Sequence, residues 1–209
     1  MKKMWIAALA LAAATSAQAH ELWAERGANG KLQIWLGEPE KPIPAAGDPA
    51  FPSLKSPKLV PASTGTQTRG PGYIEMDVAP GDVRVWDDNI FAPWQEDGKT
   101  AGGVYYARSG RSDTTAKLPF EIVPVSPNGN RFTVIFNGKP VAQQAVTLVS
   151  PERWMLALET DAAGQVELPL REKGRYIVKA ELKETGDFTL SSGAVQMVSR
   201  ITTTSFVVR

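Results

Sequence analysis

Residues 160–180 have the sequence TDAAGQVELPLREKGRYIVKA, and this stretch decides the fold class. Asp161 and Gly164 are turn formers, so they predict a tight connection into a strand over Gln165–Leu170. In Arg175–Lys183, apolar side chains then alternate with polar ones, which is the period of a strand with one face buried. Two strands joined by a short connection indicate a β-sheet protein.

The same pattern continues outward from this stretch through the second half of the chain. Seven short strands within about 90 residues is the size of an immunoglobulin-like sandwich. The segment 186–196 is polar and contains glycine, so we expect a long loop before the last strand. The expected strands are Pro119–Val125, Arg131–Asn137, Ala145–Val149, Trp154–Thr160, Gln165–Leu170, Arg175–Lys183 and Arg200–Val208.

The first half of the chain is also rich in short strand patterns. Seven prolines fall within residues 39–61, so we expect an extended surface loop there. We place a domain boundary near residues 112–118. The sequence therefore predicts an all-β chain of two β-sandwich domains, immunoglobulin-like or prealbumin-like, over residues 20–115 and 116–209. The expected strands of the first domain are Lys31–Leu36, Tyr73–Val78, Val83–Trp86 and Val104–Arg108.

Residues 1–19 are typical of a secretory signal peptide. A basic start, Met1-Lys2-Lys3, precedes an apolar run, and Ala17-Gln18-Ala19 is a small-x-small cleavage site. The apolar run is about half the ~20 residues that a transmembrane anchor needs, and no cysteine follows for a lipid anchor. We therefore expect cleavage after Ala19, a periplasmic protein and no direct membrane anchor.

Charge and residue counts exclude several function classes. Loss of Lys2 and Lys3 with the signal changes the formal net charge from +1 to −1, so we expect no nucleic-acid partner. The chain has no cysteine, which excludes disulfides, cysteine nucleophiles and thiolate metal sites. It has one histidine, which leaves almost no room for Ser-His-Asp triads or multi-histidine zinc sites. We therefore expect a protein that is not an enzyme.

That one histidine, His20, becomes the first residue if a peptidase cuts after Ala19. Its imidazole then lies beside a free α-amine, and these two nitrogens could chelate Cu(II), Ni(II) or Co(II), copper most tightly. Glu21 is adjacent and is our second candidate ligand, and Asp87 or Asp88 could complete the shell from a loop. The alternative interpretation of His20 is that it is simply a polar residue before a strand. For Asp87 and Asp88, the alternative is a turn that ends a strand.

Residues 160–180 resemble the TDxxG…GxYxVxA signature of carboxypeptidase-regulatory-like or prealbumin-like sandwich domains. The start His20–Trp23 is similar to the mature start of a bacterial periplasmic family of unknown function. Three further segments are also similar to segments of that family: Val85–Trp94, Leu118–Pro124 and Ile201–Val208. Some members are labelled as periplasmic components of cobalt/nickel uptake systems. The resemblance covers essentially the whole mature chain and implies export, two β-sandwiches and a role in handling a transition metal.

Together these observations predict a periplasmic, non-enzymatic binding or accessory protein. It would bind one nickel, cobalt or copper ion through His20 and Glu21 in support of metal uptake, with a membrane transporter or receptor as its partner. The alternative is a metal-independent interaction module that docks a protein through Trp94, the proline-rich loop or an exposed sheet edge.

Overall fold

The protein is all-β, as the sequence predicts. The computed structural model describes residues 20–62 and 65–209, so the expected signal peptide lies outside the described residues. Within the described residues, the chain forms strands β1 to β16 and one short 3-10 helix, η2. No helix in this part of the chain is long and apolar enough to cross a membrane.

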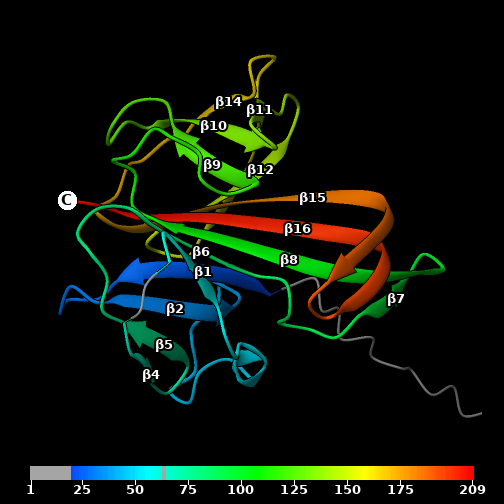
Figure 1. The fold of residues 1–209 in the computed structure, drawn as a ribbon. Coiled ribbons are helices and arrows are strands. Elements are labelled where there is room, and N and C mark those ends of the chain that lie inside the picture. The colour runs from blue at the N-terminus through cyan, green and yellow to red at the C-terminus, as the bar shows by residue number, and fades with distance from the viewer. Residues whose placement is uncertain (1–19, 63–64) are drawn as a thin grey trace, which may run out of the picture.

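The strands form three sheets (Figure 1). The N-terminal sheet has the order β1 (Glu21–Arg26), β2 (Leu32–Gly37), β5 (Tyr73–Met76) and β4 (Gln67–Arg69). The central sheet has the order β13 (Met155–Glu159), β12 (Ala145–Val149), β15 (Gly174–Leu190), β16 (Gly193–Val208), β8 (Lys99–Ser109), β6 (Val83–Asp87) and β3 (Lys58–Val60), with β7 (Trp94–Glu96) also beside β8. The C-terminal sheet places β9 (Phe120–Pro124), β14 (Gln165–Glu167) and β11 (Lys139–Pro140) beside β10 (Arg131–Phe136).

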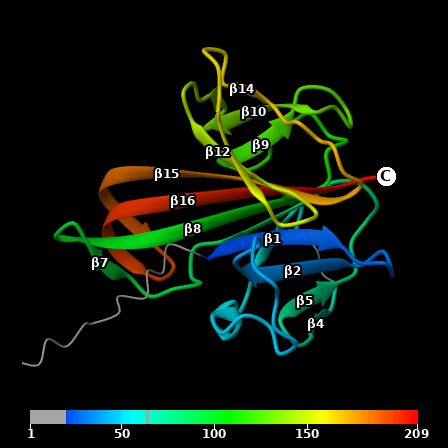
Figure 2. The ribbon, with the colours of Figure 1, turned by 180° about the vertical axis from the view of Figure 1, so that it is seen from behind.

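The central sheet lies between the other two sheets, as Figures 1 and 2 show from opposite sides. Strand β8 illustrates the arrangement, because Val104 and Tyr106 belong to the core on the side of the C-terminal sheet. Tyr105 and Ala107 belong to the other core, against the N-terminal sheet. A strand that is buried on both faces needs a continuous apolar run, which is what residues 104–107 provide.

Strands from both expected domains share the central sheet. β8 pairs with β16 in parallel, from Ala101 opposite Met197 to Ser109 opposite Ser205. The expected division between residues 115 and 116 falls in the connection between β8 and β9, and the separation into two domains stays a prediction.

The expected loop over residues 186–196 is wrong. The expected strands before and after it extend through this segment as a long antiparallel hairpin of β15 and β16. Phe188 and Leu190 are half-buried against the core, whereas Asp187 and Thr189, which alternate with them, are exposed. The segment is therefore a half-buried strand whose polar residues cover its open face. The other five expected strands of this half are confirmed within a few residues.

The hydroxyl-rich end of β16 ties the three layers together. Thr203 Oγ1 donates a hydrogen bond of 2.7 Å to the carbonyl of Leu22, in the N-terminal sheet. Thr204 Oγ1 donates one of 2.7 Å to the carbonyl of Ile122, in the C-terminal sheet. Because successive side chains of a strand point to opposite faces, this threonine run can reach both neighbouring layers.

The proline-rich segment 39–61 is largely a loop, as expected, but it is more than a surface connection. It contains η2 (Phe51–Ser53) and the edge strand β3, which pairs with β6. Phe51, Leu54 and Leu59 are buried in the core beside the N-terminal sheet. These apolar side chains anchor the loop, and the anchored loop positions Asp48 next to β1.

Candidate functional site

His20 lies directly before β1 and has one polar partner. Its Nε2 atom is 3.1 Å from Oδ1 of Asp48. Its ring lies 5.9 Å from the ring of Phe91, centroid to centroid, so one side of the imidazole faces an apolar group. The other ring nitrogen, Nδ1, is buried and has no hydrogen-bond partner among the described residues.

Asp48 is held in place by its own turn. Its Oδ1 atom accepts a hydrogen bond of 2.7 Å from the backbone N–H of Ala50, two residues further on. This is the contact of an Asx-turn. A Cβ atom on Gly37 would lie only 3.0 Å from Asp48 Oδ2, so the glycine at the end of β2 lets the carboxylate approach the sheet. The turn and the approach to Gly37 therefore position the Asp48 carboxylate independently of its contact with His20.

The contact with Asp48 determines which nitrogen of His20 is free. Nε2 faces the carboxylate at 3.1 Å, and in the tautomer that carries its proton on Nε2 the lone pair lies on Nδ1. This carboxylate–histidine arrangement commonly fixes the orientation of a metal-binding imidazole. His20 therefore presents a buried Nδ1 atom without a partner among the described residues, on a ring whose Nε2 atom faces Asp48.

Glu21, the other predicted ligand, has different partners. Its Oε1 atom accepts a hydrogen bond from Nζ of Lys179 on β15, and that ammonium is also 3.4 Å from Glu40. Its Oε2 atom is buried without a hydrogen-bond partner among the described residues. Burial raises the pKa of Glu21 from 4.5 to about 7, although Lys179 opposes the shift. The structure thus gives His20 and Glu21 separate environments.

The remaining candidates from the sequence make local contacts. Asp87 Oδ1 accepts a hydrogen bond of 2.8 Å from the amide of Asn89, which agrees with the turn interpretation. Asp88 forms an ion pair of 3.2 Å with Lys58. Trp94 is half-buried on β7, and its Nε1 atom donates a hydrogen bond of 2.9 Å to Glu96.

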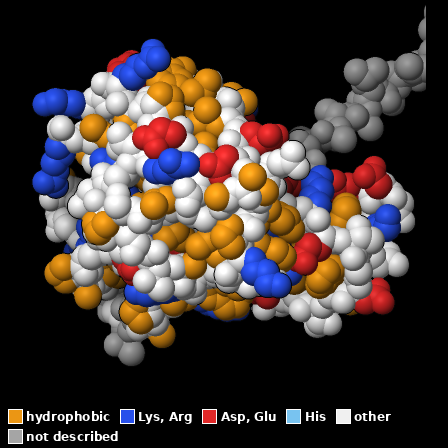
Figure 3. Space-filling model, turned by 90° about the horizontal axis from the view of Figure 1, so that it is seen from above, with side chains coloured by type: hydrophobic (Ala, Val, Ile, Leu, Met, Phe, Trp, Pro, Cys, Tyr) orange, Lys and Arg blue, Asp and Glu red, His pale blue; other side chains and the backbone are white. Residues whose placement is uncertain are grey.

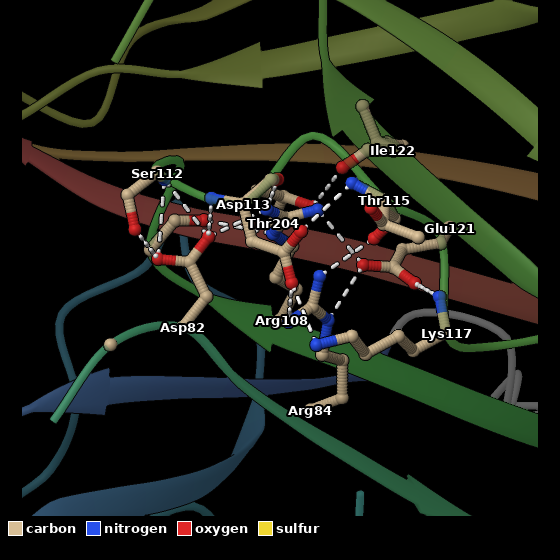
Figure 4. Close-up of polar contacts among 12 residues, drawn as sticks. Asp82, Arg84, Arg108, Ser112, Asp113, Thr115, Lys117, Glu121, Ile122 and Thr204 are labelled. Atoms are coloured by element: carbon tan, nitrogen blue, oxygen red, sulfur yellow. Dashed lines mark hydrogen bonds and ion pairs between the residues drawn. The ribbon is translucent and has the colours of Figure 1, made fainter. Parts of the chain in front are cut away.

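Sequence reasoning missed a buried ionic network between β6, β8 and β9 (Figure 4). Glu121 Oε1 accepts hydrogen bonds from Arg84 Nε at 3.0 Å and from Arg108 Nη1 at 2.9 Å. Its Oε2 atom accepts two backbone N–H groups, those of Lys117 and Leu118. All three ionic side chains are at most 1 % exposed. Charged residues at inward positions of expected strands were the signal for this network.

Two aspartates complete the network at its edge. Asp82 lies 2.6 Å from Arg108 Nη2, and Asp113 lies 3.0 Å from Arg84 Nη1. Arg84 also donates a hydrogen bond of 2.9 Å to the carbonyl of Thr115. The carboxylates and guanidinium groups satisfy one another, so this cluster holds the β8–β9 connection against the sheet and offers no open chemistry.

Asp113 should make the protein sensitive to acid. Its hydrogen bond from Lys117, together with Arg84, holds the pKa of its carboxyl well below the usual range. A carboxyl with a depressed pKa in the folded state stabilises that state above the unfolded pKa of about 3.9, and the contribution is lost as pH falls further. We expect the urea midpoint of the wild type to decrease when the pH is lowered below 4. The Asp113→Asn protein should be less stable than the wild type at pH 6 but should lose less stability on acidification. An equal gap between the two proteins at pH 6 and pH 2.5 would contradict this.

Comparisons with known proteins give one family match. A family model described as a domain of unknown function, DUF4198, matches residues 62–184. No curated protein matches the chain. Among solved structures, the chain is similar to the Bacteroides ovatus mixed-linkage glucan utilization locus protein SGBP-B in complex with a mixed-linkage heptasaccharide, at 10 % identity and a TM-score of 0.18. That match covers 83 % of this chain and 52 % of the other, so the chain spans about half the length of SGBP-B.

Proposed function

The chain belongs to the DUF4198 family, whose function is unknown, and from its geometry we propose a periplasmic, non-enzymatic accessory protein that binds one transition-metal ion at His20. One observation carries the proposal. The Nε2 atom of His20 lies 3.1 Å from Asp48 Oδ1, and its Nδ1 atom is buried with no partner among the described residues. A buried polar atom without a partner is costly, and a bound ion would satisfy it.

The free nitrogen is the one that chelation needs. In a chain that starts at His20, the α-amine and Nδ1 belong to the same residue and can close a chelate ring on one ion. Both are borderline nitrogen donors, which suit Cu(II), Ni(II) and Co(II), with copper bound most tightly. If Nδ1 rather than Nε2 faced Asp48, this chelate could not form.

The α-amine is essential to this proposal. The part of the chain that the structure describes contains no cluster of three or more His, Cys, Asp or Glu side chains that could hold a metal ion. An ion on His20 would therefore keep open coordination positions, which Glu21 Oε2, water or a partner could fill. Open positions suit a protein that passes the ion to a membrane transporter or receptor, the partner that we propose.

The first test compares two N-termini. Protein that starts at His20 is titrated with Cu(II), Ni(II) and Co(II) by isothermal titration calorimetry, and we expect one equivalent, with copper tightest. A single alanine added before His20 moves the amine away from the imidazole, and we expect the copper affinity to fall about 100-fold, or ~2.7 kcal/mol. Equal affinity of the two forms would disprove the chelate, and no binding to either would favour the metal-independent interaction module.

The second test separates the two carboxylates near the histidine. Asp48→Asn keeps an oxygen for the Ala50 amide but removes the charge that orients His20, so we expect the copper affinity to fall ~10–100-fold. Glu21→Gln tests whether that side chain contributes to binding: a lower copper affinity would support Glu21 as a ligand, and an unchanged affinity would exclude it. Asp77→Asn is the control, since its side chain is 71 % exposed. An Asp48→Asn protein that binds copper as the wild type does would contradict the role of Asp48.

A further inference from the structure

A cleft opens at the end of the central sheet where the C-terminus lies. Its volume is about 480 Å³, which is in the range of small-ligand sites. Four arginines line it, together with Glu25 and Asp82: Arg26, Arg111, Arg175 and Arg209. Figure 3 shows Lys and Arg side chains gathered along the same end of the molecule, at the left of the view. The cleft contains neither His20 nor Asp48.

Arg26 is held rigidly without a countercharge. Its guanidinium group donates hydrogen bonds to three backbone carbonyls, those of Gly30, Ala79 and Gly81. Among residues 20–62 and 65–209, no carboxylate lies within ion-pair distance of it. Carbonyl oxygens fix the group in place but leave its charge uncompensated, and a guanidinium has five N–H donors to share.

Arg111 is in the same situation. Its Nη1 atom donates hydrogen bonds of 2.9 Å to the carbonyl of Gly129 and of 2.8 Å to Oδ1 of Asn130. Its guanidinium lies 4.6 Å above the ring of Phe206, which holds the group flat at the wall of the cleft. The side chain is half-buried, and none of its partners in the described chain is a carboxylate. Desolvation without an anion is unfavourable for a cation, so a bound anion would relieve it.

The two acidic side chains in the cleft are already engaged. Asp82 pairs with Arg108 of the ionic network at 2.6 Å, and Glu25 pairs with Arg175 at 3.4 Å. Arg26 and Arg111 therefore remain as uncompensated, positioned forks that face one cavity. Guanidinium forks match the geometry of carboxylate and phosphate groups.

We infer that this cleft binds a small ligand through its oxyanion groups, carboxylate or phosphate, which contact Arg26 and Arg111. The site is independent of the proposed metal site, so its ligand does not require His20. The cavity is too small for a macromolecule and large enough for a compact organic anion.

The test uses citrate and inorganic phosphate as probes, in buffers of matched ionic strength, with the full chain that starts at His20. Amide shifts in two-dimensional NMR locate binding, and we expect Gly81, Gly110 and Asn128 at the cleft to shift. Citrate alone would identify a carboxylate ligand, phosphate alone a phosphate-bearing one, and both a general oxyanion site. No shift with either probe, or shifts spread over the whole surface, would overturn the inference.

Variants then test the arginines. Arg111→Gln should weaken binding of the probe about tenfold or more, as expected for a lost charge-assisted contact. Arg171→Gln is the control, because this exposed arginine lies outside the cleft. Equal weakening by both variants would show a non-specific charge effect and overturn the inference. The NMR mapping on the wild type decides the question even if Arg111→Gln does not fold.

Discussion

Replacing Glu121 by glutamine is expected to destabilise the folded protein by about 3–5 kcal/mol. Glu121 is fully buried, and one of its oxygens accepts hydrogen bonds from both Arg84 and Arg108. The amide keeps the shape of the side chain but removes its charge. The two buried guanidinium groups then lose the carboxylate charge that compensates them. Breaking a buried ion pair destabilises the fold by more than the intact pair stabilises it, because a desolvated charge is left behind.

Urea unfolding at neutral pH measures this effect through the shift of the midpoint at constant slope. Glu167→Gln is the matched control, because Glu167 is an exposed glutamate on β14, and we expect it to change stability by less than ~0.5 kcal/mol. If Glu121→Gln cost no more than this control, the network would not hold β9 against β6 and β8.

Replacing Gly47 by alanine is expected to cost about 2–5 kcal/mol. Gly47 has a φ of +86°, and a Cβ atom there would lie 2.2 Å from the Cα atom of Gly72. This neighbour is backbone with its own positive φ of +90°, so it cannot rotate away as a side chain could. The left-handed conformation costs ~1–2 kcal/mol for a non-glycine residue, and the forced separation of the two loops adds ~1–3 kcal/mol.

Gly30→Ala is the control for conformation alone. Gly30 has a similar φ of +80°, but a Cβ atom there would meet no atom within 4 Å. We therefore expect only the ~1–2 kcal/mol of backbone strain. Thermal and urea unfolding of both variants measure the difference, and equal losses would show that the Gly47–Gly72 contact is unimportant. Because Asp48 follows Gly47, the first variant should also weaken copper binding, whereas Gly30→Ala should not.

Local patterns in the sequence predict the strands well because the alternation of apolar and polar residues is a property of each segment. Residues 160–180 contain β14 and the start of β15, as their turn and alternation predict. The pattern fails at 186–196, where polarity resembles a loop but β15 and β16 pair with each other and pack Phe188 and Leu190 against the core. The parallel pairing of β8 with β16 joins residues about a hundred positions apart, and no local period records such a pairing.

The candidate site divides in the same way. The sequence by itself determined the chemistry of His20, since it follows a predicted cleavage site and is the one histidine in the chain. Only the tertiary structure decided that Asp48 takes Nε2, that Nδ1 stays free and that Glu21 contacts Lys179 instead. The reason is physical: residue type fixes which atoms can donate or accept, but a partner is chosen by the packing of segments far apart in the chain.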